Sequence, residues 1–131
     1  MILLKATSQK WTSGKGISHG TKYMIMIIAG QSSEKIEIDQ LWVGEKFLKT
    51  KVFLYGKTVQ EKDFNKGDTL LLSADDLIML DKNRNEIINQ DSTIQIPFKY
   101  IGEGLISYTV NNKRKYVEIK KFESVKPLIY P

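Results

Sequence analysis

The residues TKYMIMIIA, positions 21–29, contain the longest apolar stretch of this chain, Tyr23 to Ala29. Alternate side chains of a β-strand point to opposite faces, and here both sets are apolar. A strand of this kind is usually central in its sheet and covered on both faces. No stretch approaches the ~18 consecutive apolar residues that a membrane-spanning helix needs. Residues 21–29 therefore predict a strand at the heart of a β-protein.

Shorter segments of alternating apolar residues lie on either side of this strand, and glycines separate most of them. No window keeps helical periodicity over three turns, and the best helical candidate is a turn or two at 74–80. A polar loop is predicted at 56–68, with Phe64 as its anchor. Further strands are predicted at 2–7, 35–43, 47–55, 69–73, 93–100 and, as a hairpin, 105–122.

Two of these segments carry marks of irregularity. In 35–43 the apolar positions change phase, from Ile36 and Ile38 to Leu41 and Val43, which predicts a β-bulge near Asp39-Gln40. In 93–100 a proline at position 97 removes a backbone donor, which predicts an edge strand or a strand next to a bulge.

The hairpin at 105–122 has the clearest local pattern. If the chain reverses about Asn112-Lys113, Tyr108 pairs with Val117, Ile106 pairs with Ile119, and all four side chains share one face. Asparagine tolerates the positive φ that tight hairpin turns require. The tip then presents a basic triplet to solvent, namely Lys113, Arg114 and Lys115.

Eight or nine strands in 131 residues predict one all-β domain that spans residues 1–131. The favoured architecture is a two-layer antiparallel β-sandwich, immunoglobulin-like in outline. A five-stranded barrel of the oligonucleotide-binding type is the alternative. The number of strands favours the sandwich.

The net charge of +5 is concentrated at the two ends of the chain. Residues 1–30 hold four lysines and no acid, residues 111–131 hold six basic residues against two acids, and residues 31–110 contribute −3. Two basic ends on one face would attract nucleic acid or another polyanion. However, 18 of the 20 basic residues are lysine, whereas phosphate and base readers favour arginine. Solubility and protection of strand edges are therefore the preferred interpretation.

The composition excludes several kinds of chemistry. The chain has no cysteine, which excludes disulfides, thiolate metal sites and cysteine nucleophiles. Its single histidine, His19, lies in a predicted loop, and the adjacent Ser18 is not expected to converge with it. No Gly-x-Ser-x-Gly elbow, dinucleotide fingerprint or marked carboxylate pair is present. We therefore expect a protein that is not an enzyme and needs no cofactor.

One segment resembles the start of a calcium-binding loop. Asp81, Asn83 and Asn85 place oxygen ligands at every second residue, and Asp91 follows. Glutamate stands where such a loop has its turn glycine, and two flanking basic residues oppose a dication. A polar connection is the preferred interpretation, and calcium is a minor hypothesis.

The two tryptophans are candidates for ligand binding. Trp11 is the better candidate for an exposed ring on which a glycan or a peptide could pack, because it adjoins a glycine-rich segment. Trp42 is more often a core residue between sheets. Single-stranded nucleic acid would need such rings interleaved with lysines. The candidate ligand-binding residues are Trp11, His19, Trp42, Lys113, Arg114 and Lys115.

The chain contains ATSQKW at 6–11, DQLWVG at 39–44, KGDT at 66–69 and, within 108–122, KRKY at 113–116. These segments resemble a group of small all-β proteins of bacteria that commonly follow an export signal. The resemblance implies an exported, cell-envelope setting and no particular activity. The opening residues 1–4 are too short for the apolar core of a signal peptide, so a cytoplasmic location stays open.

Together these features predict a non-enzymatic binding or interaction module whose partner is a protein or a glycan. Binding of single-stranded nucleic acid or another polyanion through the basic ends is the alternative. Self-association is a further hypothesis. Met24, Met26 and Ile28 would form an exposed apolar patch if only one sheet covered their strand.

Overall fold

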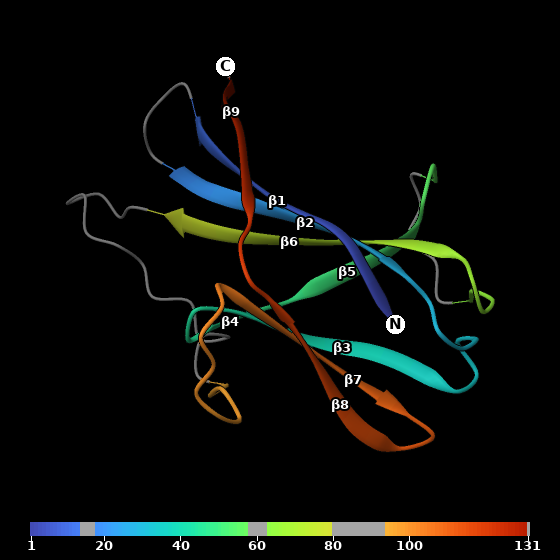
Figure 1. Ribbon diagram of the computed structural model, residues 1–131. Helices are drawn as coiled ribbons and strands as arrows, with labels where there is room; N and C mark the ends of the chain where they lie inside the picture. Colours follow the sequence, from blue (N-terminus) through green and yellow to red (C-terminus); the bar gives the residue numbers. More distant parts are fainter. Residues whose placement is uncertain (14–17, 58–62, 80–93, 131) are drawn as a thin grey trace.

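Nine β-strands and no helix make up the regular structure of the residues that the computed structural model describes, which are 1–13, 18–57, 63–79 and 94–130 (Figure 1). Within these residues no helix is long and apolar enough to cross a membrane. The strands are β1 (Ile2–Ser13), β2 (Ser18–Ile28), β3 (Ile36–Val43), β4 (Lys46–Leu48), β5 (Thr50–Leu54), β6 (Thr69–Met79), β7 (Gly104–Val110), β8 (Lys113–Ile119) and β9 (Glu123–Tyr130).

The strands form two sheets that pack face to face (Figure 1). Sheet A has the order β5-β6-β2-β1-β9, and sheet B has the order β4-β3-β7-β8. This arrangement confirms the predicted β-sandwich and excludes the closed barrel. Paired strands are antiparallel except β1 and β9, which run parallel. No residue pattern anticipated that parallel pair.

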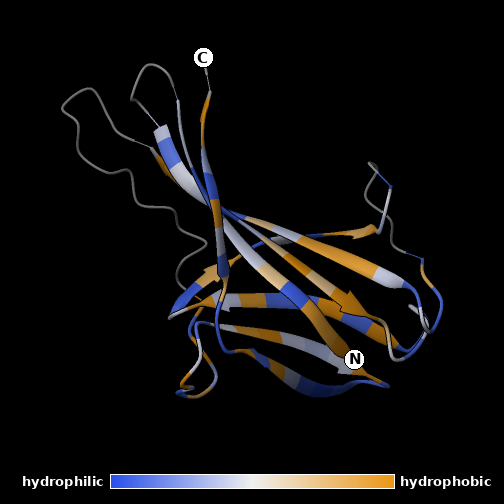
Figure 2. Cartoon of the chain, turned by 45° about the horizontal axis from the view of Figure 1, so that its top comes forward, coloured by the Kyte–Doolittle hydropathy of each residue, from blue (hydrophilic) through white to orange (hydrophobic). Residues whose placement is uncertain are grey.

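The core lies between the sheets, and the apolar parts of the strands lie mostly where the two layers overlap (Figure 2). β2 is central in sheet A, as predicted. Its inner side chains, such as Ile25 and Ile27, are fully buried. The expectation that both faces are covered is wrong, because Met24, Met26 and Ile28 stay partly exposed on the outer face. Self-association through these three residues stays a prediction.

The predicted bulge in 35–43 is confirmed. The register of β3 against β7 shifts between Ile38 and Gln40, so Ile38 lies opposite Tyr108 and Leu41 lies opposite Ile106. The extra residue keeps apolar side chains on the core side of both halves of β3. It also turns Trp42 to the outer face of sheet B.

Residues 47–55 do not form the single strand that their alternation predicted. β4 ends at Leu48 in sheet B and β5 begins at Thr50 in sheet A, so the chain changes sheets at Lys49. Leu48, Val52 and Leu54 all pack against the same core, because both strands face it. Alternation therefore indicates which side is buried and not which strand is the neighbour.

Three strands of sheet A are longer than predicted. β1 continues to Ser13, and β2 begins at Ser18, so His19 lies in a strand and not in the predicted loop. β6 continues to Met79, so the helical turn predicted at 74–80 is wrong over the described residues. The added residues of β1 and β2 are mostly polar, so hydropathy missed them, whereas those of β6 include Leu77 and Ile78 but do not alternate as a strand.

The hairpin of β7 and β8 turns one residue earlier than predicted. Asn111 and Asn112 form the turn with φ of 50° and 67°, so Ile106 pairs with Val117 and not with Ile119. The predicted inner face is nevertheless right, because a register change of two residues keeps every side chain on its face.

Residues 94–100 are not the predicted strand. They cross the outer face of sheet B, where Ile96 and Tyr100 pack on a second apolar cluster that includes Trp42. The indole Nε1 of Trp42 donates to the carbonyl oxygen of Ile94 at 3.1 Å, and the Tyr100 hydroxyl donates to that of Gly44. The apolar alternation here therefore reflects packing of an irregular segment onto a sheet. Trp42 is a core residue, but it does not lie between the sheets.

Candidate functional site

At one end of the sandwich, sheet A extends beyond sheet B (Figure 1). The last inner row that packs against the core runs across Ser8, Tyr23 and Ala74. Beyond it, the inner side chains Lys10 and Thr12 are exposed. We call the extending part the overhang. It comprises residues 9–13 of β1, 18–22 of β2, 75–79 of β6 and 125–130 of β9.

The outer face of the overhang carries Trp11 in a row that crosses four strands. Trp11 pairs with Gly20 on one side and with Leu128 on the other, and Gly20 pairs with Leu77. The indole ring lies over Gly20, since a Cβ atom there would be 3.0 Å from the ring carbon Cζ2. Leu77 and Leu128 are 42% and 41% exposed. The row is thus an apolar surface open to solvent, with an aromatic ring in it.

A hollow of about 360 Å³ lies beside this ring, lined by Trp11, Lys22, Asp75 and Leu77. Lys22 and Asp75 face each other across β2 and β6. Among the described residues, neither side chain forms an ion pair or a hydrogen bond. The hollow therefore combines an aromatic ring with one cationic and one anionic group, both available to a ligand.

His19 lies on the opposite face from Trp11. It pairs with Thr12 of β1 and Ile78 of β6 on the inner side of the overhang. Neighbouring residues of a strand point to opposite faces, so Ser18 turns away from His19. The structure therefore brings Trp11 and His19 to the same end of the molecule but does not join them in one site.

A groove of about 540 Å³ opens where the overhang leaves sheet B. Five segments of the chain converge on it, and its lining includes Ser8, Tyr23, Val43, Glu103, Phe122 and Ser124. The rings of Tyr23 and Phe122 lie 4.9 Å apart between centroids. Burial raises the pKa of the Tyr23 hydroxyl, and the charge of Asp76 adds to this effect. Sequence reasoning missed this groove, because pairing between distant strands creates it.

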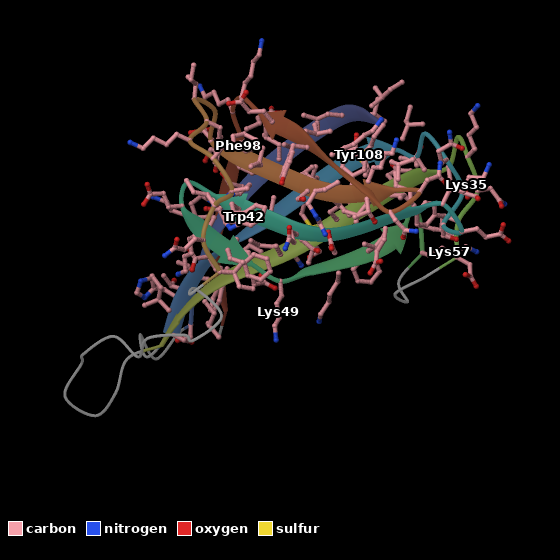
Figure 3. The ribbon with its side chains drawn as sticks, turned by 90° about the horizontal axis from the view of Figure 1, so that it is seen from below. Lys35, Trp42, Lys49, Lys57, Phe98 and Tyr108 are labelled. Carbon is pink, nitrogen blue, oxygen red and sulfur yellow. The ribbon has the colours of Figure 1, made fainter. Side chains whose placement is uncertain are left out.

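The basic triplet lies at the other end of the sandwich. The backbone N–H of Asn111 donates to the carbonyl of Lys35, and Figure 3 shows Lys35 at the end of sheet B opposite Trp42. All three residues of the triplet are exposed, and hydrogen bonds tie the Arg114 side chain to neighbouring strands of sheet B. Its guanidinium donates to both carboxylate oxygens of Asp39, at 2.8 and 2.9 Å. These hydrogen bonds raise the pKa of Arg114.

Of the remaining predicted residues, the structure describes Trp42, which joins neither the hollow nor the groove. Trp42 is 1% exposed and is unavailable to a ligand. Asp81, Asn83, Asn85 and Asp91 lie outside the described residues. Within the described ranges, no group of three histidine or acidic side chains could hold a metal ion.

Comparisons of the chain with protein-family models, with curated proteins and with solved structures find no match. Any functional conclusion therefore depends on the geometry of the overhang and of the groove beneath it.

Proposed function

We propose that the protein is a non-enzymatic binding module that holds a saccharide on the outer face of the overhang. One observation carries the proposal, namely that Trp11 lies over Gly20 beside Lys22 and Asp75 in a solvent-open hollow. The glycine is needed there, because any larger residue would meet the indole ring.

The chemistry of the hollow suits a sugar ring. One face of a pyranose presents C–H groups, which pack on an aromatic ring, and its rim presents hydroxyl groups. Asp75 can accept hydrogen bonds from those hydroxyls and Lys22 can donate to them. The exposed Leu77 and Leu128 would extend the apolar contact along the row. A polyanion would instead need several cations, and here one acid balances one lysine.

The arrangement of the other rings argues against the nucleic-acid alternative. Trp42 and Tyr108 are buried, and Tyr116 lies on sheet B, away from the overhang. The basic N- and C-terminal segments do meet, because β1 and β9 are neighbours. However, Lys113 and Lys115 lie at the far end of the sandwich from Trp11, so these two lysines do not flank its ring.

Pooled oligosaccharides test the proposal by intrinsic fluorescence and by thermal melts at low and high salt. We expect a saturable fluorescence change from Trp11, while the buried Trp42 stays silent. Trp11→Ala should weaken binding by at least about tenfold, as for an aromatic residue at the centre of a contact. The matched control is Tyr55→Ala, which removes a 63% exposed ring elsewhere and should leave binding unchanged.

The measurements at low and high salt distinguish saccharide binding from nucleic-acid binding. Saccharide binding should be nearly independent of salt, whereas binding of a single-stranded oligonucleotide should fall steeply as salt rises. The proposal fails if no oligosaccharide shifts the melt, or if Trp11→Ala binds as tightly as the original chain. Light scattering at high protein concentration separately tests self-association through Met24, Met26 and Ile28.

We further propose that the fold is immunoglobulin-like with one strand added. The order β5-β6-β2-β1 corresponds to strands D-E-B-A of that fold, and β4-β3-β7-β8 corresponds to C′-C-F-G. β9 would then be the addition. A saccharide ligand also fits the exported setting that the resemblance of residues 6–11, 39–44 and 66–69 implies. Fractionation of producing cells tests that setting.

A further inference from the structure

The carboxylate of Glu103 is held firmly at the edge of the groove beneath the overhang. The backbone N–H of Glu103 donates to the carbonyl of Ile119, and the backbone carbonyl of Glu103 accepts from the N–H of Gly44, each at 2.9 Å. Its Oε1 accepts from the N–H of Phe122 at 2.7 Å. Two hydrogen bonds thus fix the backbone of Glu103 and a third holds its carboxylate before any ligand arrives, which lowers the cost of binding one.

Glu103 is also the one charged side chain among the described residues that line the groove. The nearby Asp76 is neutralised by Lys46, whose Nζ lies 2.5 Å from Oδ1. The second oxygen of Glu103 has no hydrogen-bond partner among the described residues. The groove therefore presents a single fixed negative charge.

The rest of the lining is apolar or carries hydroxyl groups. Val43, Tyr23 and Phe122 supply the apolar surface, and Ser8 and Ser124 lie beside Tyr23 in one row across three strands. An aromatic ring attracts a cation placed over its face. Hydroxyl oxygens can accept the remaining hydrogen bonds of an ammonium group.

We propose that this groove binds a primary ammonium group on a short apolar stem, with the Glu103 carboxylate as its counter-ion and Tyr23, Val43 and Phe122 along the stem. The ammonium group belongs either to a free amine or to a lysine side chain of a partner protein. This site lies on the inner face of sheet A, next to the overhang, and it does not depend on the saccharide proposal for the outer face.

Three probes of similar size and different charge test the proposal: n-butylammonium, butan-1-ol and butyrate. Each is titrated into the ¹⁵N-labelled full chain and followed by ¹H–¹⁵N NMR. We expect saturable shifts for n-butylammonium, centred on the backbone amides around Tyr23, Glu103 and Ser124. The alcohol and the anion should bind at least about tenfold more weakly, because a hydrogen bond to a charged group is lost.

Two variants locate the charge. Glu103→Gln keeps an oxygen that accepts from the Phe122 N–H, so the fold is retained, and it should weaken n-butylammonium binding by at least about tenfold. Glu34→Gln removes an exposed carboxylate at the far end of the molecule and should change nothing. Well-dispersed spectra of both variants verify folding.

The capped tripeptide acetyl-Gly-Lys-Gly-amide distinguishes the two sources. Binding as tight as that of n-butylammonium supports a lysine side chain of a partner, and binding of the free amine alone supports a small amine. Equal binding of all three stems overturns the proposal, as do shifts that do not saturate or a Glu103→Gln variant that binds like the original chain.

Discussion

At the scale of single residues, Gly20 determines where the Trp11 ring can lie. A Cβ atom at position 20 would be 2.4 Å from the backbone oxygen of Asp76 and 3.0 Å from the indole ring. We predict that Gly20→Ala destabilises the fold by about 1–3 kcal/mol, because the backbone contact forces a local shift. Urea denaturation measures the difference, and the displaced ring should change tryptophan emission.

Gly56 offers the matched control for Gly20→Ala. Its φ is +84°, and a Cβ atom there would meet nothing within 4 Å. Asparagine tolerates positive φ, so Gly56→Asn should cost less than about 1 kcal/mol. If Gly20→Ala proved as mild as Gly56→Asn, the close packing of Trp11 on β2 would be wrong.

Tyr23 gives the fold a dependence on alkaline pH. Burial raises the pKa of its hydroxyl above the unfolded value of about 10. The neutral form therefore stabilises the folded state fully below about pH 10, and this contribution is lost as the pH rises toward the folded pKa. We predict that Tyr23→Phe loses less stability than the original chain between about pH 9 and 11.

Denaturation curves at the two pH values measure the effect of Tyr23→Phe. The control variant is Tyr55→Phe, which alters a ring that is 63% exposed. Equal losses in the original chain and in Tyr23→Phe would contradict the prediction.

At the scale of single elements, the turn between β7 and β8 depends on two left-handed residues. Asn111 and Asn112 have φ of 50° and 67°, values typical of a type I′ turn. Glycine adopts them freely and β-branched residues do not. We predict that Asn112→Gly is neutral or slightly stabilising and that Asn112→Val costs about 1–3 kcal/mol. Thermal melts compare the two, and equal melting temperatures would contradict this turn.

Local sequence patterns predicted which side chains are buried better than they predicted which strands pair with each other. The phase change at Asp39-Gln40 placed Ile38 and Leu41 correctly, because a bulge leaves a local trace in the sequence. The change of sheets at Lys49 leaves none, since both strands face one core. Residues 94–100 alternate for a different reason, as Ile96 and Tyr100 pack over Trp42 without forming a ladder.

The candidate sites followed the same division. Trp11 could be identified from its residue type and its glycine-rich neighbourhood. Lys22 and Asp75 could not, because they meet only through the register of β2 with β6. Glu103 looked like any of fifteen acids. The role that we propose for Glu103 depends on its hydrogen bonds with Phe122 and Gly44. The fold brings these residues together from distant parts of the sequence.

At the scale of the whole molecule, the fold is dominated by pairing between distant segments. Thr7 pairs with Glu123, and Tyr23 pairs with Ala74. Loop closure must precede such contacts, so all-β proteins of this kind fold slowly. We predict single-exponential refolding in milliseconds to seconds, observed by stopped-flow fluorescence of the buried Trp42. Refolding within microseconds would contradict this topology.

The parallel pair of β1 and β9 also determines how the molecule would respond to a stretching force. The chain ends emerge at opposite ends of this pair (Figure 1), so tension on the two termini would slide β1 and β9 past each other. Their hydrogen bonds would then carry the load together, whereas strands peeled from one end yield bond by bond. The ninth strand thus acts as a mechanical clamp, and tethering the protein between its termini would place the greatest resistance at the pairing of residues 7–13 with 123–130.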